Sequence, residues 1–400
     1  MSLVGRARVA VNRLALKFLQ FPRPFTLTGA GSSLALCREI ASTGARRVLV
    51  ITDKPLFDLG LVAPACKALA DSGVAVEVFH DVVPDPGYEV VLGGVDRLKR
   101  FGADAVLAIG GGSSIDCAKA ILHCHANDAH PARLTGLWLY ALPRRRGLPL
   151  YAVPTTAGTG SEVTIVSVVS DTRARTKSPI IDPKLVPAMV ALDPELMVGL
   201  PPHITAATGM DALTHAVEAY VSSLADAQTD ALARAAVATI VSQLPVAYSN
   251  GRDLAARERM AIASSMAGLA FTRAGVGYVH AIAHQLGALY HLPHGLANAI
   301  VMPHVLDVSK GHCTERLADL ARTSGLAREG ATAGELADAF IARIRAMNEA
   351  MGIPGKVKEL RREDFATIVR NAFAEAHGTY GVPRYLSRTE AHALLEEMLP

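Results

Sequence analysis

The sequence lacks several features that would place it in a special class. Its 40 basic and 37 acidic side chains leave a net charge of only +3, so we expect no nucleic-acid surface. The five cysteines are scattered and include no Cys-x-x-Cys, which argues against a disulfide framework and favours a reducing compartment. Since no run of about eighteen apolar residues occurs, we also expect no membrane span and predict a cytoplasmic protein.

The first twenty residues are basic, with no acidic residue before Glu39. This composition resembles an organellar transit peptide, which would place the protein in the mitochondrial matrix. We favour a basic amphipathic arm that lies on the fold or on a partner subunit. The segment is poor in serine and too polar for a secretory signal.

The chain of 400 residues is too long for one typical core, so two domains are expected. In the first half, β-branched runs alternate with segments of helical spacing, which predicts a parallel sheet covered by helices on both faces. Beyond "LPPH", residues 200–203, long alanine-rich helical segments replace the short runs. We therefore predict an α/β domain at 1–199 and an all-α domain at 200–400.

The expected strands and helices have the following bounds. In the first domain, strands are expected at 46–52, 74–83, 104–112, 149–156, 164–170 and 188–193, and helices at 61–73, 88–102 and 113–126. In the second domain, helices are expected at 204–223, 226–244, 252–274, 276–290, 314–323, 332–352 and 363–376.

A glycine-rich segment ends one of these strands and opens a helix. In "AIGGGSSIDCAK", residues 108–119, glycines allow a tight turn and bring backbone N–H groups close to a phosphate at a helix N-terminus. The segment differs from the G-x-G-x-x-G of the common dinucleotide fold, and an ordinary strand–helix turn would read much the same.

Two other features strengthen the nucleotide interpretation. Asp53 directly follows the strand at 46–52, where a carboxylate can accept ribose hydroxyls and would repel a 2′-phosphate; a helix N-cap explains it equally well. "PTTAGTGSE", residues 154–162, offers hydroxyls to a phosphate or to the nicotinamide amide, although alone it would pass as an ordinary polar loop.

Candidate metal ligands occur in two segments. In "GMDALTHAVEAY", Asp211 and His215 stand four apart on an expected helix and so share a face. Four histidines follow within "VHAIAHQLGALYHLPHG". Spacing alone favours His280 with His284, and it does not decide which of the four bind. A carboxylate with imidazoles suits a divalent transition metal, although a buried Asp–His hydrogen bond is a common alternative.

Together, four ordered segments resemble the iron-containing (group III) alcohol dehydrogenases, a family that includes lactaldehyde reductase and several butanol and ethanol dehydrogenases. The segments are "GGGSSIDCAK", "PTTAGTGSE", "GMDALTHAVEAY" and "HAIAHQLGALYHLPHGLANAIVMPHV", and the resemblance spans roughly residues 25 to 400. It implies a Rossmann-like parallel sheet with a variant glycine loop, followed by a helical metal-binding domain. This is also the architecture of dehydroquinate synthases.

The resemblance also implies roles for individual residues. It implies that the metal is Fe²⁺, with Zn²⁺, Mn²⁺ or Co²⁺ as alternatives. The implied ligands are Asp211, His215, His280 and His294. The resemblance removes His284 from the ligands and places it near nicotinamide and substrate, while His291 matches no motif. The implied cofactor contacts, to NAD in preference to NADP, are Asp53, Asp85, Gly110, Gly111, Gly112, Ser113, Thr155, Thr156, Thr159 and Lys177.

Three of the motif residues carry a further interpretation. Asp85 in "VVPDP" stands where many relatives have Asn, and a carboxylate can accept a hydrogen bond there but cannot donate one. For Asp116 and Lys119 in the glycine motif, we expect a carboxylate that complements the helix dipole and an i,i+3 salt bridge, not a direct part in catalysis.

The implied reaction is reversible hydride transfer between a small alcohol or aldehyde and NAD in an interdomain cleft, with His284 passing the hydroxyl proton toward solvent. The family also suggests a homodimer or larger homo-oligomer. One alternative is a hydroxyacid–oxoacid transhydrogenase. Another is a metal- and NAD-dependent lyase like dehydroquinate synthase, whose acidic phosphorylated substrate calls for several Lys and Arg; the ligand motifs here have mostly neutral neighbours. A non-enzymatic binding protein ranks last.

Overall fold

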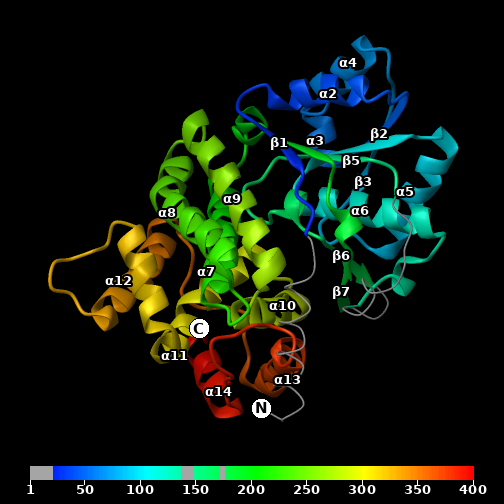
Figure 1. Cartoon of the computed structure of the whole chain (residues 1–400). Helices are drawn as coiled ribbons and strands as arrows, with labels where there is room; N and C mark the ends of the chain where they lie inside the picture. Colours follow the sequence, from blue (N-terminus) through cyan, green and yellow to red (C-terminus); the bar gives the residue numbers. More distant parts are fainter. Residues whose placement is uncertain (1–20, 137–146, 172–175) are drawn as a thin grey trace. The chain divides into compact units, whose positions relative to one another are not determined.

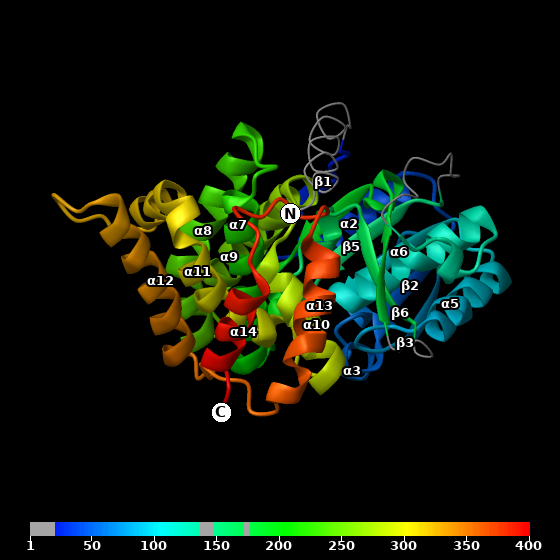
Figure 2. The same ribbon diagram turned by 90° about the horizontal axis from the view of Figure 1, so that it is seen from below.

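The computed structural model describes residues 21–136, 147–171 and 176–400 (Figures 1 and 2). These residues form two compact units, Phe21–Gly199 and Leu200–Pro400. The basic arm discussed above lies outside the described residues.

The first unit is built on a six-stranded parallel sheet with the order β1-β8-β5-β4-β2-β3. The parallel sheet expected from the sequence is therefore confirmed. The strands are β1 (Phe25–Thr28), β2 (Arg47–Asp53), β3 (Ala75–Val82), β4 (Ala105–Gly110), β5 (Leu150–Pro154) and β8 (Met189–Leu192). Strands β6 (Val166–Asp171) and β7 (Thr176–Ile181) form a separate antiparallel hairpin.

Helices cover both faces of this sheet, because its central strands carry apolar side chains on both sides. On one face, Val48, Val50, Leu107 and Val153 pack with helices α2 and α4 in one buried cluster. On the other face lie α5 and α6 (Figure 1). The helices of this unit are α2 (Ser32–Ser42), α3 (Lys54–Asp58), α4 (Ala63–Asp71), α5 (Tyr88–Phe101) and α6 (Gly112–Asn127).

The second unit, residues 200–400, contains helices and no strand, as expected (Figure 2). Its core comes from packing of α7 against α8, α9 and α11. The helices are α7 (Pro202–Val221), α8 (Ala227–Ser249), α9 (Leu254–Ala274), α10 (Tyr278–Tyr290), α11 (His294–Thr323), α12 (Ala333–Ala350), α13 (Phe365–Ala376) and α14 (Arg388–Glu397).

Helix α11 corrects the sequence expectation, which placed a helix only at 314–323. The helix begins twenty residues earlier, at His294, and continues through Pro303. The backbone does leave helical geometry at Cys313, where φ is −138° and ψ is 25°. The expected segment is thus the last part of a longer helix, after a kink.

Within the described residues, α8 is the one helix that is long and apolar enough to cross a membrane by length and composition. Its buried residues, among them Ala233, Val237 and Leu244, face the core of the helical unit, where α8 packs against α7 and α9. Packing inside this unit accounts for its apolar side chains.

Candidate metal and dinucleotide sites

Four residues from three helices meet in the second unit. Asp211 and His215 lie on α7, His280 lies on α10, and His294 is the first residue of α11. Their candidate ligand atoms all lie within 4.8 Å of one another. The Asp211 Oδ1 atom is 3.4 Å from His294 Nε2 and 3.9 Å from His280 Nε2. We call these residues the four-residue cluster.

Local sequence explains how the three helices come together. The i,i+4 spacing on α7 puts Asp211 and His215 on one face. Pro293 precedes the first residue of α11 and so fixes the point at which His294 enters the helix. A Cβ atom at Gly295 would lie 2.3 Å from the carbonyl oxygen of Ala207, so only glycine lets the start of α11 approach α7 this closely.

A buried carboxylate, Glu218, orients one residue of the four-residue cluster. It accepts hydrogen bonds from His280 Nδ1 (2.6 Å) and from the backbone N–H groups of Gly277 (2.8 Å) and Val279 (2.7 Å). Burial raises the pKa of Glu218 to about 8, against the opposing effect of hydrogen bonds from backbone N–H groups. With Nδ1 bound to Glu218, His280 turns Nε2 toward the cluster, as carboxylate partners of metal-binding histidines do.

Burial lowers the pKa of His280 well below its usual value, and the neighbouring imidazoles of His215, His294 and His284 act in the same direction. His280 is therefore neutral, which is the form that binds a metal.

Asn298 is a second residue that the sequence interpretation missed. It lies one turn after His294 on α11, and its side chain is fully buried. Its amide nitrogen donates to Asp211 Oδ1 (2.7 Å) and lies 3.2 Å from the Nε2 atoms of His280 and His294. The signals for both missed residues were available, because Glu218 shares the α7 face of Asp211 and His215, and Asn298 follows His294 by four.

The two remaining histidines of the motif are not members of the four-residue cluster. His284 stacks on His294, with ring centroids 5.3 Å apart, and its Nδ1 lies 2.7 Å from Glu375 Oε1. His291 is exposed at the end of α10, in the left-handed region with φ of 56°. The structure thus groups His280 with His294, whereas spacing alone had favoured His280 with His284.

In the first unit, the predicted nucleotide-binding segments follow neighbouring strands. Gly110 ends β4, Pro154 ends β5, and Asp53 ends β2. Since carboxyl ends of parallel strands share one edge, these segments lie together there, where open α/β sheets bind ligands.

The glycine loop needs its glycines for close packing. Gly110 has a φ of 157°, and a Cβ atom on it would lie 2.4 Å from Ser114 Oγ. A Cβ atom on Gly112 would lie 2.6 Å from Thr159 Cγ2, so the glycine and threonine loops touch. Thr155 N donates to Gly110 O (3.0 Å) across the same junction. Ser113 and Thr156 are both half-buried, and Gly111 precedes the first residue of α6.

Three other candidate cofactor residues have definite places. Asp53 caps α3, since its Oδ1 accepts a hydrogen bond from Leu56 N (2.9 Å), so the N-cap role is confirmed. A carboxylate that caps a helix can still accept further hydrogen bonds, such as those from ribose hydroxyls. Asp85 is exposed with φ of 53°, and its N–H lies 3.4 Å from Ser113 Oγ. Lys177 pairs with Ser170 in the β6–β7 hairpin, and its side chain lies outside the described residues.

Asp116 and Lys119 tether the threonine loop and the following hairpin. Asp116 accepts from Ser161 Oγ and from Val168 N (2.9 Å). Lys119 Nζ donates to the carbonyl oxygens of Ser161 (2.5 Å), Thr164 (2.9 Å) and Val166 (2.8 Å). Their structural role agrees with the expectation, but its form differs, since the partners are backbone groups and hydroxyls of another segment. Burial lowers the pKa of Lys119 to about 8, against the opposing charges of Asp116 and Glu162.

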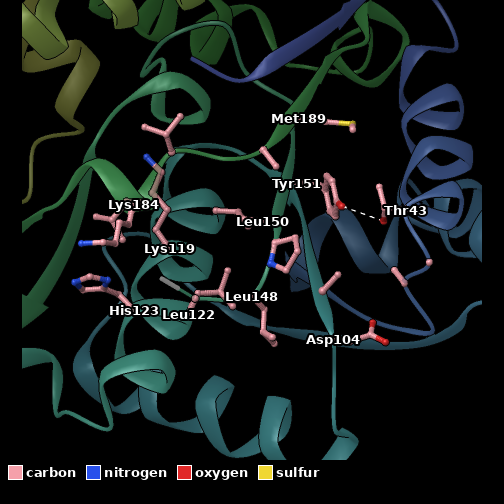
Figure 3. A pocket seen from close by; sticks show the side chains of 18 residues that line it. Thr43, Asp104, Lys119, Leu122, His123, Leu148, Leu150, Tyr151, Lys184 and Met189 are labelled. Atoms are coloured by element: carbon pink, nitrogen blue, oxygen red, sulfur yellow. Dashed lines mark hydrogen bonds between the residues drawn. The ribbon is translucent and has the colours of Figure 1, made fainter. Parts of the chain in front are cut away.

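Lys119 also lines a cavity of about 580 Å³ (Figure 3). The other lining residues include Thr43, Asp104, Leu150 and Met189, at or just before the amino ends of β2, β4, β5 and β8. This cavity lies at the edge of the sheet opposite to Gly110 and Asp53, so it is separate from the candidate dinucleotide site.

The residues present fit both implied groups. One carboxylate and three imidazoles are donors that suit divalent iron, zinc, manganese or cobalt. The turn between β4 and α6 has glycines at 110 and 112, where a Cβ atom would meet neighbouring side chains. Such a turn suits a pyrophosphate at a helix N-terminus. A dinucleotide-type α/β unit followed by a helical unit with such a cluster is the arrangement of a metal- and nucleotide-dependent enzyme.

Comparison with known proteins supports this interpretation. Residues 24–194 match the model "Iron-containing alcohol dehydrogenase", and residues 205–399 match the C-terminal model of the Fe-containing alcohol dehydrogenase family. An NAD-dependent methanol dehydrogenase from Bacillus methanolicus is 40% identical over 89% of this chain and 93% of its own. Lactaldehyde reductase from Escherichia coli is 37% identical, with the same coverage of both chains.

Structural similarity is equally extensive. The structure of an alcohol dehydrogenase from Oenococcus oeni matches with a TM-score of 0.91 and 32% identity, over 95% of this chain and 99% of its own. The chain therefore belongs to the iron-containing alcohol dehydrogenase family.

Proposed function

We propose that this protein transfers a hydride reversibly between a small alcohol and NAD, with Fe²⁺ held by the four-residue cluster. The observation that carries the proposal is the cluster itself, whose carboxylate and three imidazoles converge within 4.8 Å. A divalent cation held there supplies Lewis-acid chemistry to the oxygen of the alcohol or aldehyde. The redox step belongs to the nicotinamide, and the protein contributes positioning and polarity.

His284 is the residue that we assign to the hydroxyl proton. It lies beside His294 but outside the cluster, and one third of its side chain is exposed (33%). A side chain so placed can accept the proton at Nε2 and pass it to solvent.

Small and weakly polar alcohols are the substrate class that we favour. The ring of Phe271 stacks on His215 with centroids 4.2 Å apart, which gives the cluster an apolar wall. Arg273, the basic residue nearest the cluster in sequence, pairs with Asp226 at 2.7 Å. These surroundings favour a neutral alcohol over the phosphorylated acid of a dehydroquinate synthase.

For the cofactor we propose NAD in preference to NADP, bound by the glycine and threonine loops and by Asp53 and Lys177. The Asp53 carboxylate at the end of β2 would repel a 2′-phosphate. Comparable catalytic efficiency with NADP would refute this preference.

One panel assay tests the function. The full-length protein is purified anaerobically, its metal content is measured, and C2–C8 alcohols, diols, glycerol and hydroxyacids are each offered with NAD and with NADP. We expect NAD reduction with a small alcohol, in proportion to bound iron. Activity with 4-hydroxybutyrate and 2-oxoglutarate without added NAD would favour a transhydrogenase. A metal-replete sample that reduces NAD with none of these alcohols would refute the proposal.

A further inference from the structure

Glu375 on α13 makes a close contact with His284 that no sequence motif predicted. The carboxylate Oε1 lies 2.7 Å from His284 Nδ1, although 91 residues separate the two in the chain. The side chains are 33% and 27% exposed, so the pair lies partly open to solvent. Glu375 is not a member of the four-residue cluster and lies far from those four residues in the sequence.

Other side chains hold Glu375 in place. The Tyr380 hydroxyl donates to Oε1 (2.6 Å), and Gln285 Nε2 lies 3.4 Å from Oε2. Burial and the charge of Glu375 raise the pKa of Tyr380 well above its usual value. The phenol therefore stays protonated and donates a hydrogen bond to Glu375. Glu375 therefore acts as an acceptor toward each neighbour.

An accepting carboxylate determines the tautomer of the ring beside it. When Glu375 accepts at Nδ1, His284 carries its hydrogen on Nδ1, and Nε2 keeps a lone pair. Stacking on His294, with an interplanar angle of 17°, holds the plane of the ring. The two contacts together fix both the orientation of His284 and the nitrogen that is able to accept a proton.

We propose that Glu375 is a positioning residue for the dehydrogenase reaction, which acts by holding His284 in the Nδ1–H tautomer with Nε2 directed to its substrate. This inference rests on the proposed function of His284. Tyr380 supports Glu375 in the same role through the shared Oε1 atom.

A double-mutant cycle tests the proposal. Glu375→Gln keeps the shape of the side chain but lets an amide donate to Nδ1, which favours the wrong tautomer. We expect kcat for the alcohol to fall roughly 10- to 100-fold, with unchanged metal content and Tm. In a His284→Ala background the same substitution should change kcat less than about 2-fold, because coupled residues are not additive.

Two further variants complete the experiment. Tyr380→Phe should cause a smaller loss of kcat that also disappears in the His284→Ala background, and it keeps the test valid if Glu375→Gln folds poorly. Glu363→Gln, at an exposed carboxylate next to α13, is the matched control and should behave as wild type.

Either of two results would overturn the proposal. Equal losses from Glu375→Gln in both backgrounds would assign Glu375 a purely structural role and leave the proposed function intact. A His284→Ala protein with full activity would remove the role of His284 itself, while wild-type activity and metal content would still report on the cluster.

Discussion

Helix α10 carries two histidines one turn apart, each paired with a carboxylate from another helix, and the two pairs differ in burial. His280 and Glu218 are 3% and 5% exposed, whereas His284 and Glu375 are 33% and 27% exposed. The Nδ1–carboxylate distances are nearly equal, at 2.6 Å and 2.7 Å. We infer that the same pairing of side chains serves a buried residue of the metal site in one case and a solvent-accessible proton path in the other.

The partners of the two carboxylates reinforce this difference. Glu218 also accepts two backbone N–H groups where α10 begins, so it is fixed to the helix itself. Glu375 is held by the side chains of Tyr380 and Gln285. We infer that the inner pair orients a ligand and the outer pair orients a reacting group.

The largest expected effect comes from His294→Ala, which removes one of the proposed ligands. The protein should lose bound metal, and activity should fall by about 1000-fold or more, because the Lewis acid is lost. Metal content and kcat/KM are the measurements. His291→Ala, three residues earlier and exposed, is the control and should keep both metal and activity. Normal metal content in His294→Ala would contradict the ligand assignment.

His284→Ala should lower the catalytic rate without the loss of metal that is expected for the inner histidine, His280. We expect wild-type metal content with kcat reduced by about 100-fold, since a positioned acid–base group contributes this much. Steady-state kinetics with the best alcohol of the panel provide the test. Full activity at every pH examined would exclude the proton role.

Glu218→Gln should weaken the inner pair without removing a ligand. Metal affinity is expected to fall about 10- to 100-fold, as for other carboxylates behind metal-bound histidines. Competition with a chelator measures the affinity. Glu375→Gln, in the outer pair, should leave the metal affinity unchanged. Equal losses of metal affinity in the two variants would contradict the different roles of the inner and outer carboxylates.

Asn298→Ala should have the smallest effect of the four, because it removes one hydrogen bond to Asp211. We expect roughly 10-fold weaker metal binding. Asn348→Ala is a matched control, since Asn348 is also buried and donates to a backbone carbonyl, that of Ala299. The control should lose stability but retain metal affinity. Unchanged metal affinity in Asn298→Ala would show that Asn298 has no part in the site.

Much of the fold was predictable because burial left a clear hydrophobic signal in the sequence. The central strands β2, β4 and β5 are apolar on both faces, and their positions agree with the expected runs. The four-residue β1 was missed, since an edge strand whose Phe25 is 63% exposed has little pattern. The first part of α11 was missed because Pro303 and Gly311 are typical helix breakers.

The site was only partly predictable for a different reason. Helical spacing alone relates Asp211 to His215, but a helix end separates His280 from His294, so their pairing came from the family resemblance. Glu218 and Asn298 were missed although each lies at helical spacing from a candidate ligand, because that spacing does not show which segment the side chain contacts. Glu375 left no such signal, since its contact with His284 joins residues 91 apart in the chain. The compartment and the homo-oligomeric state stay predictions.

The central claim is that His280 binds the metal and His284 does not. The most direct test is the metal content per chain of His280→Ala and His284→Ala, purified anaerobically in parallel with the wild type. We expect His280→Ala to lose nearly all of its metal and His284→Ala to keep the wild-type amount. Equal metal loss in the two variants, or loss in His284→Ala alone, would contradict it.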